Sequence, residues 1–246
     1  DEPVAAGTIP PPVVRFESVS GRGRDAEPLL EDLTLEVPAG GALCLVGPPG
    51  SGAAQALQLV AGDGQVHRGR VAFDGADGRP IESPRPLLVD EDPLVLGTTV
   101  TENLQATDGA APPEGAYADA LERLDLRPYL RQLPFGDATR LGPTGLRLPL
   151  PERQKIHLAR VVLSPPPVLL LVRPLSALDP APRWRTLRKV LEALRGRSTV
   201  LFVPVSPAEA ELAERVAWIE DGRLRAVGTP AEVARDPAWV ALIGSR

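Results

Sequence analysis

The sequence predicts an α/β fold whose core is a mainly parallel sheet. Continuous apolar runs typical of buried parallel strands recur along the chain, the clearest at 168–172. Segments with the apolar spacing of helices separate these runs. A glycine-rich turn at 47–52 joins one such run to an apolar helix. Strands that alternate with helices in this way are characteristic of a parallel core sheet, and 246 residues are enough to bury a sizeable core.

The individual elements follow from local patterns in chain order. Two half-buried strands with alternating apolar residues are expected first, and continuous apolar runs predict the later strands. The expected strands cover 13–19, 29–37, 43–46, 70–73, 87–90, 168–172, 199–203, 216–220 and a run that ends at Val227. Helices are expected over 53–60, 151–163 and 184–194, with short helices after the strand at 199–203 and at the C-terminal end.

Two of these helical regions have a specific signal. Between 99 and 133 the spacing is helical, with one apolar stripe formed by Tyr117, Ala120, Leu121 and Leu124. Pro151 is suited to the first position of the helix over 151–163, because the N–H that proline lacks has no partner there. The acidic and then proline-rich residues 1–12 predict a linker.

Composition excludes several classes of function. The net charge of −5 gives no sign of nucleic-acid binding. The one cysteine, Cys44, falls in a predicted buried strand, which favours a core role and leaves no disulfide. Two histidines without a cysteine cluster predict no metal site. The absence of methionine leads us to expect a removed upstream segment, and no apolar run reaches the ~20 residues that cross a bilayer.

The glycine-rich turn has the layout of a phosphate-binding loop. The loop comprises Gly47, Pro48, Pro49, Gly50, Ser51, Gly52, Ala53, Ala54 and Gln55. Its spacing is that of G-x-x-x-x-G-K-[ST], in which backbone N–H groups at a helix N-terminus hold phosphates. Ala53 replaces the lysine, and Ala54 replaces the hydroxyl that holds Mg²⁺. Taken alone, the three glycines also fit a plain tight turn.

Further segments, in order, carry a resemblance to a known family. They are 92–96 with 97–104, Arg153-Gln154 with 158–160, the run Ser176, Ala177, Leu178 and Asp179, and the segments 221–224 and 228–232. With these segments nearly the whole chain resembles the ATP-binding domain of exporter-type ABC transporters. The resemblance implies a P-loop NTPase fold over 13–246, with an antiparallel β subdomain and a helical subdomain near 101–163. Residues 1–12 would link it to an upstream, transmembrane part.

At the functional positions the chain departs from the family. The resemblance places the Walker B carboxylates at Val172 and Arg173, the Q-loop glutamine at Glu91 and the switch histidine at Val205. The signature sequence reads Leu148, Pro149, Leu150, Pro151 and Glu152, so two prolines remove N–H donors and Glu152 brings a negative charge. The D-loop, 176–179, is retained. Near Gly23, where the family stacks an aromatic residue on adenine, the chain has no aromatic residue.

These substitutions predict that the chain has no ATPase activity of its own. Phosphoryl transfer depends on positioning and charge neutralisation, and the residues for both are missing. The resemblance implies ATP and Mg²⁺, but we expect weak nucleotide binding or none, although the loop could still attract an anion. We also expect Glu91 and Arg173 to form an ion pair in the empty site; the alternative is that both are solvated and unrelated.

Three functional hypotheses remain open. The first is a catalytically degenerate ATP-binding domain that is a structural or regulatory partner in a dimer, homo- or heterodimeric, with another ABC ATP-binding domain. The second is a functional ATP-binding subunit of an ABC transporter that couples ATP binding or hydrolysis by a partner to transmembrane transport. The third is an anion- or protein-binding module without a role in transport. The first two imply a transmembrane domain, upstream or in another chain, and a place at the cytoplasmic face of the cell membrane.

Overall fold

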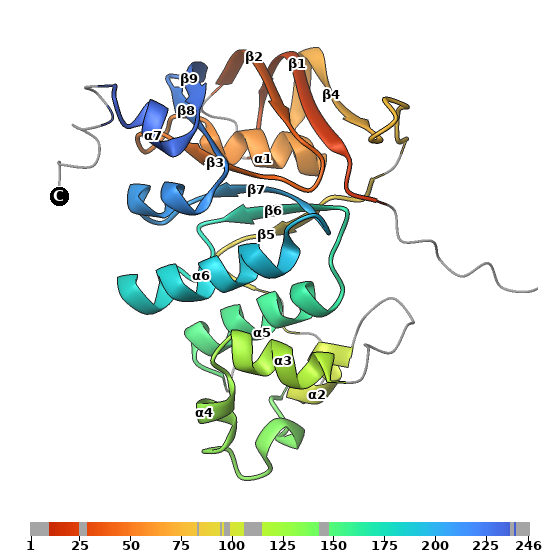
Figure 1. Cartoon of the computed structure of the whole chain (residues 1–246), viewed down its shortest axis with the longest axis vertical. Helices are drawn as coiled ribbons and strands as arrows, with labels where there is room; N and C mark the ends of the chain where they lie inside the picture. Colours follow the sequence, from red (N-terminus) through yellow and green to blue (C-terminus); the bar gives the residue numbers. More distant parts are fainter. Residues whose placement is uncertain are drawn as a thin grey trace, which may run out of the picture. The chain divides into compact units, whose positions relative to one another are not determined.

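The computed structural model describes residues 10–24, 29–82, 84–93, 95, 99–105, 115–142, 148–236 and 239. It confirms the predicted α/β class, with one sheet that is mostly parallel and one that is antiparallel (Figure 1). The chain forms two compact units. The first comprises Asp1–Leu88, Pro166–Val172 and Arg195–Arg246, and the second comprises Val89–Pro165 and Arg173–Leu194.

The first unit contains the sheets. The antiparallel sheet has the order β2 (Leu29–Val37), β1 (Val13–Arg22) and β4 (Gln65–Asp74). The larger sheet has the order β5 (Leu87–Val89), β6 (Val168–Val172), β7 (Thr199–Val203), β3 (Ala42–Val46), β8 (Arg215–Glu220) and β9 (Arg223–Gly228). Pairing is parallel for β6 with β7 and for β3 with both β7 and β8, whereas β9 is antiparallel to β8. The short helices η3 (Pro207–Leu212) and α7 (Pro230–Val233) complete this unit.

The core of the first unit lies where helix α1 (Ala53–Ala61) packs between the two sheets (Figure 1). The strand β6 has four fully buried residues in a row, as a parallel strand covered on both faces requires. Cys44 in β3 is also fully buried, which confirms the core role predicted for it. Burial raises the pKa of its thiol well above the usual value, so the thiol stays protonated at neutral pH.

The second unit is helical. It contains α2 (Val100–Gln105), α3 (Ala116–Arg123), α4 (Arg127–Leu130), the 3₁₀ turn η1 (Gly136–Ala138), α5 (Leu150–Leu163) and α6 (Pro180–Leu194). Helix α5 packs against α2, α3 and α6. The stripe predicted from the sequence is present: Ala120, Leu121 and Leu124 are buried. Tyr117 is half-buried, and its hydroxyl donates to the Asp137 carboxylate over 2.7 Å.

Several boundaries differ from the prediction for identifiable reasons. Helix α6 begins at Pro180 rather than 184, because its prolines lie in the first turn, where the N–H they lack has no helical partner. Helix α5 begins at Leu150, one residue before the predicted Pro151. Strand β4 begins at 65 rather than 70, and its first six residues are all exposed, so no alternation marked them. Residues 1–9 of the predicted linker, and most of the last predicted helix, lie outside the described residues.

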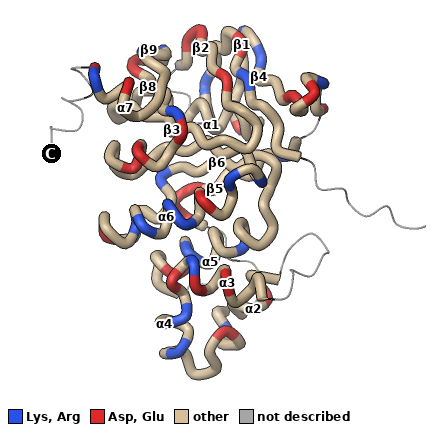
Figure 2. Tube along the Cα trace, viewed as in Figure 1, with Lys and Arg blue, Asp and Glu red and all other residues tan. Residues whose placement is uncertain are grey.

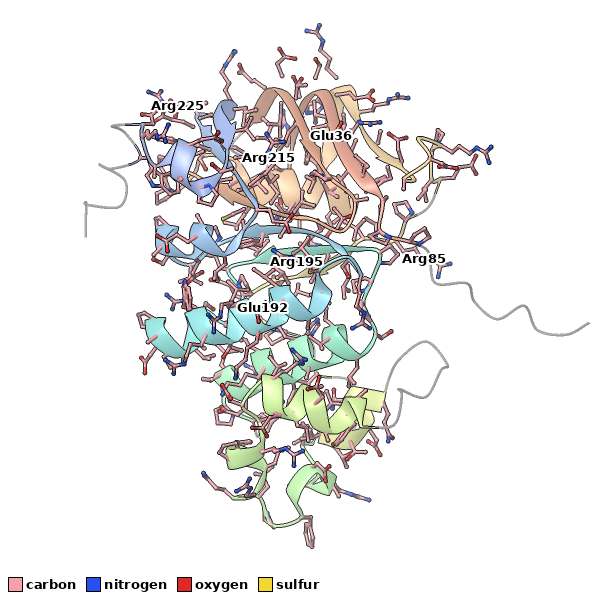
Figure 3. All side chains as sticks on the ribbon, in the orientation of Figure 1. Glu36, Arg85, Glu192, Arg195, Arg215 and Arg225 are labelled. Carbon is pink, nitrogen blue, oxygen red and sulfur yellow. The ribbon has the colours of Figure 1, made fainter. Side chains whose placement is uncertain are left out.

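The tryptophan of β8 packs against Trp239. Trp218 and Trp239 are both buried, and their rings meet edge to face with centroids 6.1 Å apart. The guanidinium of Arg225, labelled in Figure 3, lies 5.4 Å from the Trp218 ring centroid. Both tryptophans therefore serve as packing residues of this unit.

Acidic and basic residues are mixed along the described part of the chain and do not form one large patch of a single sign. Figure 2 shows basic and acidic residues interspersed along the chain. One basic residue of α6, Arg183, is buried, and its guanidinium donates to the Leu178 carbonyl over 2.9 Å. Within the described ranges, no helix combines the length and the apolar character that a bilayer crossing needs.

A buried hydroxyl connects the start of β1 to the larger sheet. Thr199 is fully buried, and its Oγ1 accepts from the Gly40 N–H over 2.9 Å and donates to the Pro12 carbonyl over 2.5 Å. Thr199→Val keeps the side-chain shape but leaves both backbone groups without this partner, so it should lower the free energy of unfolding by about 2–4 kcal/mol. Urea denaturation measures this.

The matched control is Thr34→Val on β2, where the hydroxyl is exposed and accepts one bond of 3.2 Å from Ser18. It should change the stability by less than ~0.5 kcal/mol. Equal effects of the two substitutions would contradict the role assigned to Thr199.

Candidate functional site

The glycine-rich loop joins β3 to α1 and has the backbone of a phosphate-binding loop. Gly50 and Gly52 have φ of 81° and 101°, in the left-handed region that favours glycine. Gly52 is the residue before the first helical turn, and α1 begins at Ala53 without a side-chain cap. Gly52 therefore supplies no side-chain acceptor to the N–H groups of this first turn.

Packing within the first unit also requires two of these glycines. A Cβ on Gly47 would lie 2.1 Å from the Ile219 carbonyl oxygen, and a Cβ on Gly52 would lie 2.7 Å from the Leu30 side chain. The Gly222 N–H donates to the Ser51 carbonyl over 3.0 Å and holds the loop against the β8–β9 turn. The loop geometry thus has a structural explanation that does not involve phosphate.

The loop has little to offer an anion beyond its backbone. Pro48 and Pro49 have no N–H, and the Ser51 N–H already donates to the Pro48 carbonyl over 2.9 Å. Helix α1 carries no charged residue, and Ala53 and Ala54 replace the cation and the hydroxyl. Val172, where the resemblance places a Walker B carboxylate, offers no oxygen ligand either. The donor set therefore does not fit an Mg²⁺–ATP group.

The Gln58 side chain lies beside Gly23, near the position expected to hold an adenine-stacking residue. A Cβ on Gly23 would lie 1.9 Å from the Gln58 side-chain oxygen. That oxygen accepts from the Arg24 N–H over 3.1 Å, and the Arg24 guanidinium pairs with Asp63 at 2.9 Å. The loop therefore packs its own backbone on α1, and an aromatic residue at position 23 would have to displace the Gln58 side chain.

The predicted pair between Glu91 and Arg173 is present within the second unit. Arg173 Nε lies 2.9 Å from Glu91 Oε1, and Arg173 Nη2 donates to Glu91 Oε2 over 2.9 Å. This is the two-pronged geometry that a guanidinium and a carboxylate favour. The side chains are 55% and 40% exposed, so the pair contributes only a fraction of a kcal/mol, within the ~0.2–1 kcal/mol of exposed pairs. The pair places a positive charge at position 173 and a negative charge at position 91.

Gln154 is a functional candidate that the sequence did not single out beyond the resemblance. It is buried on α5 and makes three hydrogen bonds. Its Nε2 donates to the Glu91 carbonyl over 2.8 Å and to Ser176 Oγ over 3.0 Å, and its Oε1 accepts from the Ala177 N–H over 3.1 Å. The available signal was a polar residue on the same helical face as the buried Leu158 and Val161.

The segment with the signature position begins α5. Pro149 precedes the first helical residue, Leu150, and Pro151 follows it. Proline suits these positions but supplies no N–H to a ligand. Glu152 lies in the first turn, where its charge already complements the helix dipole. This helix terminus is therefore occupied by an acidic residue of the chain itself.

The segment at the switch position is held by a buried carboxylate that the sequence analysis missed. Glu209 in η3 is 2% exposed, and its carboxylate accepts from the Val205 N–H over 3.0 Å. No local pattern signalled it, because Glu209 lies in a polar segment whose burial depends on the fold. Val205 itself has no titratable group to take up a proton.

The retained D-loop residues connect the segment after β6 to α6. Ser176 and Ala177 contact Gln154, and the Leu178 N–H donates to the Leu175 carbonyl over 2.9 Å. The Asp179 carbonyl accepts from the Arg183 N–H over 3.0 Å, at the first turn of α6. Across the described part of the chain, no group of three or more His, Cys, Asp or Glu side chains is arranged to hold a metal ion.

Comparison with known proteins identifies the class to which this fold and these segments belong. The family model described as "ABC transporter" matches residues 30–175, more than half of the chain. The chain belongs to the ABC transporter family, and its domain is the nucleotide-binding type found in exporters.

Individual relatives agree with this membership. The multidrug efflux ATP-binding/permease protein Rv0194 of Mycobacterium tuberculosis is 34% identical over 224 residues, which are 89% of this chain and 19% of that protein. The mycobactin import ATP-binding/permease protein IrtB of Mycolicibacterium smegmatis is 33% identical, over 91% of this chain and 39% of its own length. A bacterial Atm1-family ABC exporter with ATP bound matches 95% of this chain and 42% of its own, with a TM-score of 0.80 and 26% identity. The chain thus spans less than half of each of these relatives.

Substitution of Gly52 tests the packing explanation of the loop. Gly52→Ala should lower the free energy of unfolding by about 2 kcal/mol or more, because it adds left-handed strain and a contact with Leu30. Gly50→Ala is the matched control: its φ is also positive, but a Cβ there meets nothing within 4 Å. It should cost only the strain, about 1–2 kcal/mol. Thermal denaturation of both variants measures the difference, and a larger loss in Gly50→Ala would contradict the explanation.

Proposed function

We propose that this chain is a catalytically degenerate ATP-binding domain of an exporter-type ABC transporter, with a structural or regulatory role beside a second ATP-binding domain. The observation that carries the proposal is the Glu91–Arg173 pair. It puts a cation where the family has a Walker B glutamate, and it uses the carboxylate at the Q-loop position internally. A site organised in this way has no group left to activate water.

The combined losses are large compared with any residual contribution of the loop. Removing one group that stabilises transition-state charge commonly costs about 3 kcal/mol, and such losses are not additive. Here the positions of the lysine, the Mg²⁺ hydroxyl, both carboxylates and the histidine are all changed, at Ala53, Ala54, Val172, Arg173 and Val205. ATP turnover by the chain alone should therefore be undetectable.

The partners follow from the relatives. Rv0194 and IrtB are named as ATP-binding/permease proteins, so they combine this kind of domain with a membrane part. By analogy, the chain would work with a transmembrane domain, at the cytoplasmic face of the cell membrane, and with another ABC ATP-binding domain as a homo- or heterodimer. A partner that keeps its own Walker motifs would then supply the ATP hydrolysis that drives transport, which is the second candidate role.

The test is titration of a fluorescent ATP analogue with and without Mg²⁺, together with an ATPase assay. We expect no saturable binding below about 1 mM and no turnover, since the chain lacks the lysine and the metal ligands. The comparison variant A53K/A54S/V172D/R173E restores the family residues on the same scaffold. It should bind the analogue in an Mg²⁺-dependent way.

Mg²⁺-dependent turnover by the unmodified chain would overturn the proposal. Saturable binding that does not require Mg²⁺ would instead favour a nucleotide- or anion-binding module, because only the backbone N–H groups of the loop would then hold the phosphate.

A further inference from the structure

We propose that Gln154 and the Glu91–Arg173 pair form a built-in clamp. The clamp holds the segment after β5 (90–92) and the segment after β6 (173–177) in one conformation without any bound nucleotide. All of these residues belong to the second unit. The inference rests on the proposed function, because it describes how the same positions are regulated once ATP chemistry is lost.

The buried arm of the clamp is Gln154. Its amide uses both N–H donors and its carbonyl, and it joins the Glu91 backbone to Ser176 and Ala177. The side chain is 4% exposed, so water does not compete for these bonds. One side chain on α5 therefore fixes both segments to each other.

The backbone after β6 shows why a restraint is needed. Arg173 and Leu175 have φ of 46° and 59°, which non-glycine residues rarely adopt. Such conformations persist only where the surroundings determine them. The pair with Glu91 restrains the first residue of this segment, and the bonds from Gln154 restrain Ser176 and Ala177, which follow Leu175.

The second arm differs in its physical character. Arg173 and Glu91 are partly exposed, so salt screens their attraction, whereas the Gln154 bonds are buried and neutral. A neighbouring ion pair is also open to solvent: Arg153 Nη1 lies 3.5 Å from Asp92 Oδ1, and the Asp92 side chain is 85% exposed. High salt should therefore weaken the Glu91–Arg173 arm and leave the Gln154 arm unchanged.

Hydrogen exchange on the full chain tests the clamp. Gln154→Leu should speed exchange of the Ala177 amide at least about tenfold, because that N–H loses its acceptor. Arg173→Ala should speed exchange over 90–92 and 173–177 about threefold at low salt, and about 1 M NaCl, where the screening length is about 3 Å, should remove the difference. ATP with Mg²⁺ should leave both segments unchanged. The matched control, Arg185→Ala on the exposed face of α6, should exchange like the unmodified chain.

Exchange at Ala177 and over 173–177 that is the same in Gln154→Leu, Arg173→Ala and Arg185→Ala would overturn the clamp. Gln154→Leu could instead lose protection throughout the chain. The clamp is then tested by measuring hydrogen exchange at several salt concentrations in the unmodified protein and in Arg173→Lys. Exchange over 90–92 and 173–177 that does not depend on salt would overturn the clamp. Detectable ATP turnover alongside intact protection would reject the proposed function and leave the clamp standing. Hydrogen exchange therefore tests the clamp, and ATP turnover tests the proposed function.

Discussion

Burial of the central strands on both faces is the constraint on which the rest of the structure depends. The strands β6 and β7 pair residue by residue from Val168 and Thr199 to Val172 and Val203, and β3 pairs with β7 in the same direction. Because the pairing is parallel, the segments that follow these strands all start at the same edge of the sheet. The apolar strands thus determine where the segments that follow them start, whichever residues those segments contain.

Three positions that the family devotes to nucleotide have an internal partner in this chain. The Q-loop position is paired with Arg173, the N–H at the switch position donates to Glu209, and the loop at Gly23 packs on Gln58. At α5, Pro149 and Pro151 have no N–H to offer a ligand, and both prolines and Glu152 suit the start of the helix. Buried backbone groups need partners, and at these positions the chain satisfies them with its own side chains.

The sequence predicted the strands at 168–172 and 199–203 to the residue, because each is a continuous apolar run with clear boundaries. It predicted the Glu91–Arg173 pair because the resemblance brought two opposite charges to one site. It did not predict the roles of Gln154 or Glu209. The hydrogen bonds of Gln154 reach residues 63, 22 and 23 positions away in the chain, and local periodicity carries no information about such contacts.

The close packing around Gly47 and Gly52 has a consequence for how such chains evolve. Selection for a stable fold is enough to keep both glycines whether or not the loop binds phosphate, since a larger residue would collide with Ile219 or Leu30. Glycine spacing is then a record of descent, and the residues at Ala53 and Ala54 are the ones that record present chemistry. A genome survey that scores only the glycines would therefore not distinguish a loop that has the family's lysine and hydroxyl from one that has alanine at both positions.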